Sequence, residues 1–236
     1  MTKQRKAIII GLIGVVAIAA VAAFAGPVIY RDFFAAQPAP EPVLLSANDS
    51  ELRPGGSEAV DPEGLSGAWV VGEGSTAGYR VDEVLNGTPV TVTGSTGEVR
   101  GSLTVSELTL ESAEFEVDVA SIATDRAQRD SYFRDQALNT SAHPTATFVL
   151  TEPFTAESAP AEGEVIEQSL SGELTIAGVT QAVTFNAQFR VNASNVEIAG
   201  QIPIVFEAFG ITAPNLGFVS VAPDGFVEFS LVVNRG

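Results

Sequence analysis

Histidine and cysteine, the side chains that most often serve as nucleophiles, general bases and metal ligands, are nearly missing from this sequence. His143 is the single histidine among 236 residues, and there is no cysteine. Thiol nucleophiles, disulfides, thiolate metal sites and a cysteine-linked lipid anchor are therefore excluded, and one imidazole is too few for a typical zinc or copper site. The sequence predicts no metal and no cofactor, with His143-Pro144 as a turn into a strand and not as a catalytic site.

The carboxylates are numerous, but their pattern favours solubility over catalysis. Glu114, Glu116 and Asp118 alternate with Phe115 and Val117, and this period of two puts the acidic side chains on the solvent face of a strand. An enzyme needs a nucleophile with its base and orienting group, or a metal cluster, and the sequence offers neither set. We therefore expect a binding protein and not an enzyme.

The charge of the chain is strongly negative and unevenly distributed. Lysine occurs only at Lys3 and Lys6, which form a basic N-terminal end together with Arg5, and the first acid is Asp32. Beyond Lys6, nine arginines stand against 29 acidic residues, a net charge of −20. A surface of this sign repels nucleic acid and anionic lipid headgroups, so neither is an expected partner of the exterior.

Residues 7–29 contain no charged side chain, which predicts an N-terminal transmembrane helix within residues 1–30. About twenty apolar residues cross a bilayer, and the basic end places the N-terminus in the cytoplasm and the rest of the chain outside. A cleaved signal peptide is the alternative, because Ala23-Phe24-Ala25 resembles a cleavage site, although the apolar stretch exceeds the usual core of about 7–15 residues. The protein is then a single-pass protein of the cell membrane with an extracytoplasmic domain, or is secreted if the segment is cleaved.

Residues 31–64 have the composition of a linker, rich in Pro, Ala, Glu, Ser and Gly. Pro38, Pro40 and Pro42 alternate with other residues, which favours an extended, semi-rigid chain. Because this segment cannot bury a core, we interpret it as a tether that lifts the following domain off the membrane, with Val43-Leu44-Leu45 as an incidental apolar run.

Residues 65–236 carry the pattern of an all-β domain. Apolar and polar residues alternate in short segments, and turn signals such as Asn86-Gly87 separate them. The first strand is expected to contain Trp69, as a core aromatic, and residues 78–85. With this strand included, at least eight segments occur at regular spacing, with Pro203 at an edge or bulge, so we predict an antiparallel sheet that closes on itself. Eight strands leave a lumen that side chains fill or that holds one slim ligand.

Residues 124–138 interrupt the strand pattern and predict a short helix that covers one end of the barrel. The expected capping residue is Thr124 or Asp125. Oppositely charged side chains four residues apart predict ion pairs along the helix, Arg126–Asp130 and Asp130–Arg134.

A hairpin at Ser171–Phe189 is the clearest local signal in the chain. Both of its strands alternate, and Ala177-Gly178 lies where the chain must reverse. Residues 101–109 repeat the start of this pattern, which is consistent with a duplicated hairpin and also with convergence on a common turn.

Four segments resemble the YceI-like family and follow one another in the order typical of it. In chain order they are Gly67–Val71, Thr124–Asp130, His143–Phe148 and GELTIAGVTQAVTF from Gly172. The resemblance covers residues 65–235. It implies an antiparallel up-and-down, lipocalin-like, eight-stranded β-barrel with one short covering helix, located outside the cytoplasm. It also implies that the lumen holds a polyisoprenoid lipid or an isoprenoid quinone.

The candidate ligand-binding residues are the apolar side chains expected to face the lumen on the central strands, for which ordinary barrel core is the alternative: Phe115, Val117, Phe148, Leu174, Ile176, Phe185, Phe189 and Phe229. Tyr79 and Arg129 are the candidates for the polar end. The covering helix is either a plain surface helix or a lid whose Arg129 or Arg134 contacts a polar or phosphorylated lipid head.

Two functions remain open from the sequence. The first is a membrane-tethered protein that shields an isoprenoid tail in its lumen. The second is a packed, ligand-free barrel that acts as an interaction module of the cell envelope through its acidic surface or the loop Phe209–Phe218. Whether the barrel forms a homodimer is open under both.

Overall fold

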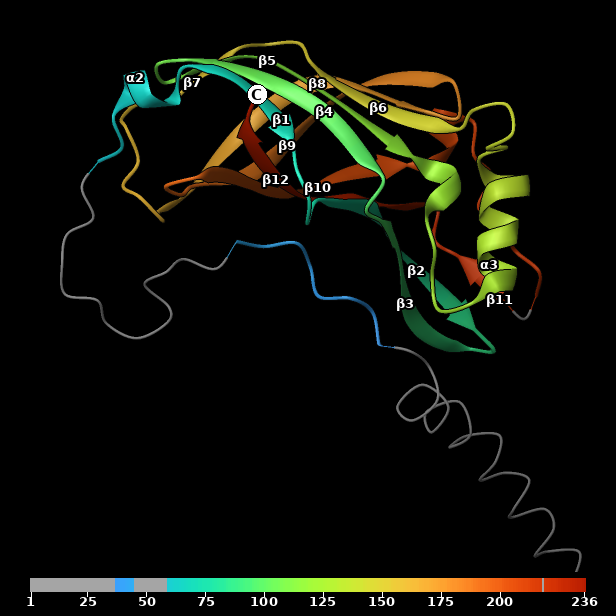
Figure 1. Ribbon diagram of the computed structural model, residues 1–236. Coiled ribbons are helices and arrows are strands. Elements are labelled where there is room, and N and C mark those ends of the chain that lie inside the picture. Colours follow the sequence, from blue (N-terminus) through green and yellow to red (C-terminus); the bar gives the residue numbers. More distant parts are fainter. Residues whose placement is uncertain (1–36, 45–58, 218) are drawn as a thin grey trace, which may run out of the picture.

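The computed structural model describes residues 37–44, 59–217 and 219–236, and the predicted transmembrane helix in residues 1–30 lies outside them. The described part is a β-barrel with short helical segments at its ends (Figure 1). Among the described residues, no helix has the length and apolar character needed to cross a membrane.

The first half of the chain contains α2 (Pro62–Leu65), β1 (Gly67–Val71), β2 (Thr76–Leu85), β3 (Thr88–Thr96), β4 (Val99–Ser106), β5 (Thr109–Asp118), η2 (Val119–Ser121), α3 (Ala127–Tyr132) and η3 (Phe133–Ala137).

The second half of the chain completes the sheet with longer strands. Its elements are β6 (Thr145–Leu150), β7 (Phe154–Thr155), β8 (Val165–Ile176), β9 (Val179–Val191), β10 (Asn195–Val205), η4 (Phe206–Phe209), β11 (Val219–Val221) and β12 (Asp224–Arg235). Every strand pair is antiparallel, and the hydrogen-bonded order runs β1-β4-β5-β6-β8-β9-β10-β12, with β12 pairing back to β1. The sheet is therefore closed, as predicted.

β1 and β2 are one strand of the barrel that is interrupted by a bulge. Both pair with β12, since Val71 lies opposite Val233 and Thr76 lies opposite Ser230. Between them, the backbone N–H of Val232 donates to Ser75 Oγ at 3.0 Å, so a side chain replaces one ladder bond. The prediction of a single first strand is thus correct in position, and the extra residues of the bulge bend it.

β3 and β4 form the next strand in the same way, because β3 pairs with β2 and β4 pairs with β1. With β5, β6, β8, β9, β10 and β12 this gives eight strand positions that follow one another in chain order. The predicted eight-stranded up-and-down barrel with a short helix is confirmed. Pro203 lies past Gly200, the last residue of β10 that pairs with β9, so its missing N–H breaks no ladder.

The two ends of the barrel differ. At one end, Trp69 is buried, its Nε1 donates to the Leu65 carbonyl at 3.0 Å, and the Arg235 guanidinium lies over its ring at 5.0 Å. Trp69 thus closes this end as a core aromatic. At the other end, α3 and η3 stand beside the barrel, near the β2–β3 hairpin and β11 (Figure 1). We call this second end the mouth.

The helix of residues 124–138 is present, but its stabilising contacts differ from the prediction. It spans α3 and η3, and the residue before α3 is Arg126, which makes no side-chain capping bond. Asp130 accepts hydrogen bonds from the N–H of Thr124 at 2.9 Å and from its Oγ1 at 2.7 Å. The predicted cap at Thr124 or Asp125 is wrong, because α3 begins at Ala127 after Arg126, although Thr124 Oγ1 accepts a hydrogen bond from the Arg126 N–H at 3.1 Å. The predicted Asp130–Arg134 ion pair is also wrong, because the Asp130 carboxylate turns back to Thr124.

Candidate functional site

The interior of the barrel contains two adjoining cavities that are lined almost entirely by apolar side chains. The inner cavity has a volume of about 90 Å³ and lies among the central strands. The mouth cavity has a volume of about 500 Å³ and opens between α3, η3 and the segment after β10. Five residues with small or medium side chains line both cavities, and we call them the neck: Ala77, Val117, Ala146, Ile176 and Val227.

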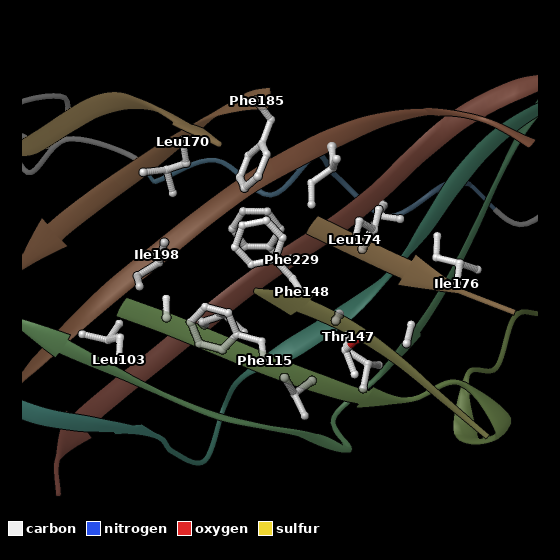
Figure 2. Close-up of a pocket in the computed structure, with 18 of the residues that line it drawn as sticks. Leu103, Phe115, Thr147, Phe148, Leu170, Leu174, Ile176, Phe185, Ile198 and Phe229 are labelled. Atoms are coloured by element: carbon white, nitrogen blue, oxygen red, sulfur yellow. The ribbon is translucent and has the colours of Figure 1, made fainter. Parts of the chain in front are cut away.

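Aromatic rings occupy the centre of the inner cavity. Phe185 packs edge-to-face against Phe148 at 5.4 Å and against Phe229 at 5.8 Å between ring centroids. Figure 2 shows these three rings close together, with Phe115 near them and Ile176 toward one end. The inward positions arise from the alternation of β5, β6, β9 and β12. Among the described residues that line this cavity, Thr147 alone has a polar side chain. This cavity can hold hydrocarbon and little else.

The mouth cavity has a stacked aromatic pair at its wall. Tyr79 on β2 and Phe133 in η3 stack with centroids 4.9 Å apart and an angle of 15° between the rings. Gly94, opposite Tyr79 on β3, makes room for the ring, because a Cβ there would lie 2.7 Å from Tyr79 Cε1. This stack joins the covering helix to the barrel.

The rim of the mouth carries a compact group of charges. The Arg129 guanidinium donates to Asp125 Oδ1 at 2.5 Å and to Glu83 Oε1 at 3.3 Å. Arg126 lies 3.5 Å from the other oxygen of Asp125. Two carboxylates, Glu83 and Asp125, thus stand against two guanidinium groups, so the charges at the rim balance.

Burial in this environment raises the pKa of Tyr79 to about 12; the nearby Arg129 opposes the shift, and the carboxylates of Asp130, Glu83 and Asp125 reinforce it. The phenol is therefore neutral at physiological pH and keeps its proton as a hydrogen-bond donor. A neutral donor beside an apolar cavity suits a carbonyl or hydroxyl group.

All ten candidate site residues line one of the two cavities. Six line the inner cavity alone: Phe115, Phe148, Leu174, Phe185, Phe189 and Phe229. Val117 and Ile176 belong to the neck, and Tyr79 and Arg129 lie at the mouth. Arg134 does not line either cavity. That these side chains contact a ligand stays a prediction.

The sequence interpretation missed several residues of the mouth. Phe133, Glu83 and Ile211 line this cavity and were not among the candidates. Glu83 had a signal, because the period of two places it on the same face of β2 as Tyr79 and Val81, and it is 8 % exposed. Phe133 and Ile211 had none, since helices and loops do not follow that period.

The described residues offer the chemistry of a binding site. No group of three or more His, Cys, Asp or Glu side chains in that part of the chain could hold a metal ion. The arrangement can instead enclose an elongated apolar molecule, with the neck around its middle and a neutral phenol at its outer end. His143 lies away from both cavities and packs against the turn at Gly178.

Comparisons with known proteins agree with this architecture. A family model described as the YceI-like domain matches residues 69–233, more than half of the chain. A polyisoprenoid-binding domain from Saccharophagus degradans has a similar structure, with a TM-score of 0.58, 16% identity and coverage of 72% of this chain and 99% of that one. Burkholderia cenocepacia BcnA has a TM-score of 0.52, 23% identity and coverage of 70% and 95%. A search of curated proteins finds no match.

Proposed function

The chain belongs to the YceI-like domain family, and from this premise we propose that it binds one isoprenoid lipid or isoprenoid quinone with its tail in the barrel lumen. The observation that carries the proposal is a pair of apolar cavities, one at the mouth and one among the central strands, that share the neck residues. The Saccharophagus degradans domain is described as polyisoprenoid-binding, which supports the same class of ligand.

The energetic basis of tail binding is the burial of hydrocarbon. Each methylene that leaves water contributes about 0.8 kcal/mol, so a tail of about ten carbons gains about 8 kcal/mol before ordering costs. The mouth cavity accepts the first part of the tail without rearrangement. The inner cavity of about 90 Å³ is small, so we propose that side chains around it, among them the packed rings of Phe148, Phe185 and Phe229, move when a tail enters.

We propose an uncharged head group, such as a quinone or an alcohol. Arg129, the cation nearest to Tyr79 at the mouth, is already shared by Glu83 and Asp125. A phosphate would compete with these two carboxylates for Arg129 and would approach a strongly acidic domain. A neutral head meets no such repulsion and can accept a hydrogen bond from the Tyr79 hydroxyl. The phosphate-binding role considered for Arg129 is therefore not part of the proposal.

The proposed location is outside the cytoplasm, with the barrel tethered to the membrane by the N-terminal apolar segment. The support is the sequence of that segment, with a basic end followed by residues 7–29 without charge. The acidic barrel has no expected role with nucleic acid, and we propose no catalytic activity for it.

A second candidate function is a packed barrel without a ligand that binds another component of the cell envelope. The small volume of the inner cavity favours it, since three edge-to-face rings already fill the centre. The loop residue Leu216, 59% exposed, would be one contact. This candidate predicts that the purified protein carries no extractable lipid.

Native mass spectrometry of the full chain, exported and purified in mild detergent and then released from it, tests the first function. We expect an adduct that extracts into organic solvent and is an isoprenoid. If none is present, purified polyprenols and quinones are added at increasing concentration. A protein that neither carries nor takes up any of them is not a carrier of isoprenoids, and the packed barrel becomes the better description.

A further inference from the structure

Residues 37–44, which we call the strap, run along the outside of the barrel instead of standing free as a tether. The strap appears in Figure 1 as the blue segment that passes along the barrel near β2, β3, β10 and β12. The sequence assigns these residues to an extended, semi-rigid linker. Three hydrogen bonds join this part of the linker to the barrel.

The strap is held at both of its ends. The N–H of Ala39 donates to Thr93 Oγ1 at 3.0 Å, and the Arg80 guanidinium donates to the Ala39 carbonyl at 2.7 Å. The N–H of Leu44 donates to Gln188 Oε1 at 2.7 Å. The proline-rich sequence assists, because an already extended chain loses little entropy when it docks.

The first contact of the strap covers an ion pair on the outer face of the sheet. Arg80 Nε lies 2.5 Å from Glu228 Oε1, and their side chains are only 11% and 12% exposed. Gln201 donates to the same carboxylate at 2.6 Å. Arg80 is therefore held in place by Glu228, and its hydrogen bond to the Ala39 carbonyl fixes this part of the strap on the barrel.

The strap begins at the mouth. Gln37, Pro38 and Ala39 line a surface hollow of about 260 Å³ together with Asp125 and Arg129, which belong to the rim. The strap then leads to Gln188 on β9, and the chain returns to the barrel at the closed end, where Ala59 bridges Ala161. The strap therefore carries the chain from the mouth toward the end where β1 starts.

This path fixes how far the mouth can lie from the N-terminal apolar segment. Only residues 30–36 separate Ile29 from Gln37, and a fully extended chain of that length spans about 30 Å at most. A free linker that reached to β1 would span about 120 Å. Docking of the strap thus removes most of the freedom of the tether.

We propose that the mouth of the barrel faces, and contacts, the bilayer in which the chain's own N-terminal segment is anchored. Two apolar side chains on the rim of the mouth cavity, Leu216 and Tyr132, are 59% and 37% exposed and form the contact. The excess acidic charge of the domain favours uncharged or zwitterionic headgroups as the contact partner. The inference rests on the membrane anchor of the proposed function. A lipid tail would then pass from bilayer to lumen without crossing open water.

The test measures the distance of each barrel end from the membrane in the full chain. The absence of cysteine allows single fluorescent labels at Leu216→Cys on the mouth and Glu157→Cys in the loop at the closed end. Both proteins are placed in zwitterionic liposomes that contain a lipid with a quencher at its headgroup. We expect strong quenching at position 216 and several-fold weaker quenching at position 157.

Two matched insertions test whether the strap sets this orientation. A Gly/Ser insertion of about 20 residues between Ala36 and Gln37 adds about 25 Å of mean reach before the strap, and it should remove at least about half of the quenching at position 216. The same insertion between Gly55 and Gly56 lies after the strap and should change nothing. The lipid load of every sample is measured by extraction.

Equal quenching at both barrel ends, equal effects of both insertions, or failure of the full chain to enter liposomes would overturn the inference. The result of this test is independent of whether the barrel carries a lipid. A protein with strong quenching at position 216 and no lipid load keeps the orientation and loses the carrier function. A protein with a full lipid load and equal quenching keeps the carrier function alone.

Discussion

Ile176 is a residue at which we expect a larger side chain to block the way between the two cavities. It lies in the neck, and it is buried at the end of β8. We expect Ile176→Trp to block the passage with an apolar group, so that the tail cannot reach the inner cavity and the lipid load falls by about ten-fold or more. Quantitative extraction of purified protein measures the load.

Val149→Trp is the matched control, because Val149 is on the neighbouring strand β6 but is 40% exposed and faces outward. It adds the same side chain without entering the lumen and should retain the lipid. If Ile176→Trp folds normally and carries the full load, the neck is not on the path of the ligand.

Tyr79 predicts a pH dependence of stability above neutrality. Its pKa of about 12 in the fold exceeds the ordinary value of 10, so folding favours the protonated phenol. The contribution is complete below pH 10 and is lost as the pH rises from 10 to 12, with a total loss of about 3 kcal/mol in the free energy of unfolding. Denaturant titrations at several pH values measure it.

Tyr79→Phe is the control for this titration, since it keeps the stack on Phe133 and removes the ionisable group. The variant should lose stability less steeply between pH 10 and 12, and its phenolate absorbance should lack the component with a midpoint near 12. An identical pH profile for the two proteins would contradict the assignment of the shift to Tyr79.

The hairpin between β8 and β9 depends on a glycine in a way that its counterpart between β2 and β3 does not. Gly178 and Gly87 have φ of +78° and +80°, so alanine is strained at both turns by about 1 kcal/mol. A Cβ at Gly178 would also lie 2.6 Å from the ring of His143, whereas a Cβ at Gly87 meets nothing within 4 Å. The two turns thus share backbone strain and differ in packing.

We expect Gly178→Ala to lower the free energy of unfolding by about 1–2 kcal/mol more than Gly87→Ala, because His143 must move. Urea denaturation of both variants measures the difference. In a His143→Ala background the two glycine substitutions should cost the same. If the difference persists there, the ring of His143 is not its cause.

The negative charge of the molecule predicts selection between lipids that have the same tail and different head groups. A polyprenol should bind about ten-fold more tightly than its monophosphate at low salt, because the phosphate meets the carboxylates at the mouth and a domain with excess acid. Added salt should narrow the gap by screening. Competition against a fluorescent lipid analogue measures both affinities.

The variant Asp125→Asn tests whether the carboxylates at the mouth cause this preference for the alcohol over the phosphate. It removes one carboxylate that pairs with Arg129 and should improve phosphate binding while leaving the alcohol unchanged. Tighter binding of the phosphate by the unmodified protein would show that Arg129 is available to an anion, and the proposed neutral head would be wrong.

Local patterns in the sequence determined the secondary structure of this protein. The period of two identified the strands and the inward faces of β5, β6, β9 and β12. Glycine between two alternating segments identified the turn at Ala177-Gly178, and the loss of the period identified the helix at 124–138. These features depend on residues close together in the chain, because side-chain direction in a strand alternates regardless of its partners. The eight inward candidates therefore line the lumen, as their period requires.

Long-range contacts decided what the sequence pattern left open. Arg129 meets Glu83 across 46 residues, and Ala39 meets Arg80 across 41. In the inner cavity, rings from the three strands β6, β9 and β12 pack together. Pairing of β12 with β1 and β2 joins strands from opposite ends of the domain. No local period encodes such contacts, because their geometry exists only once the barrel has closed and distant side chains compete for the same space.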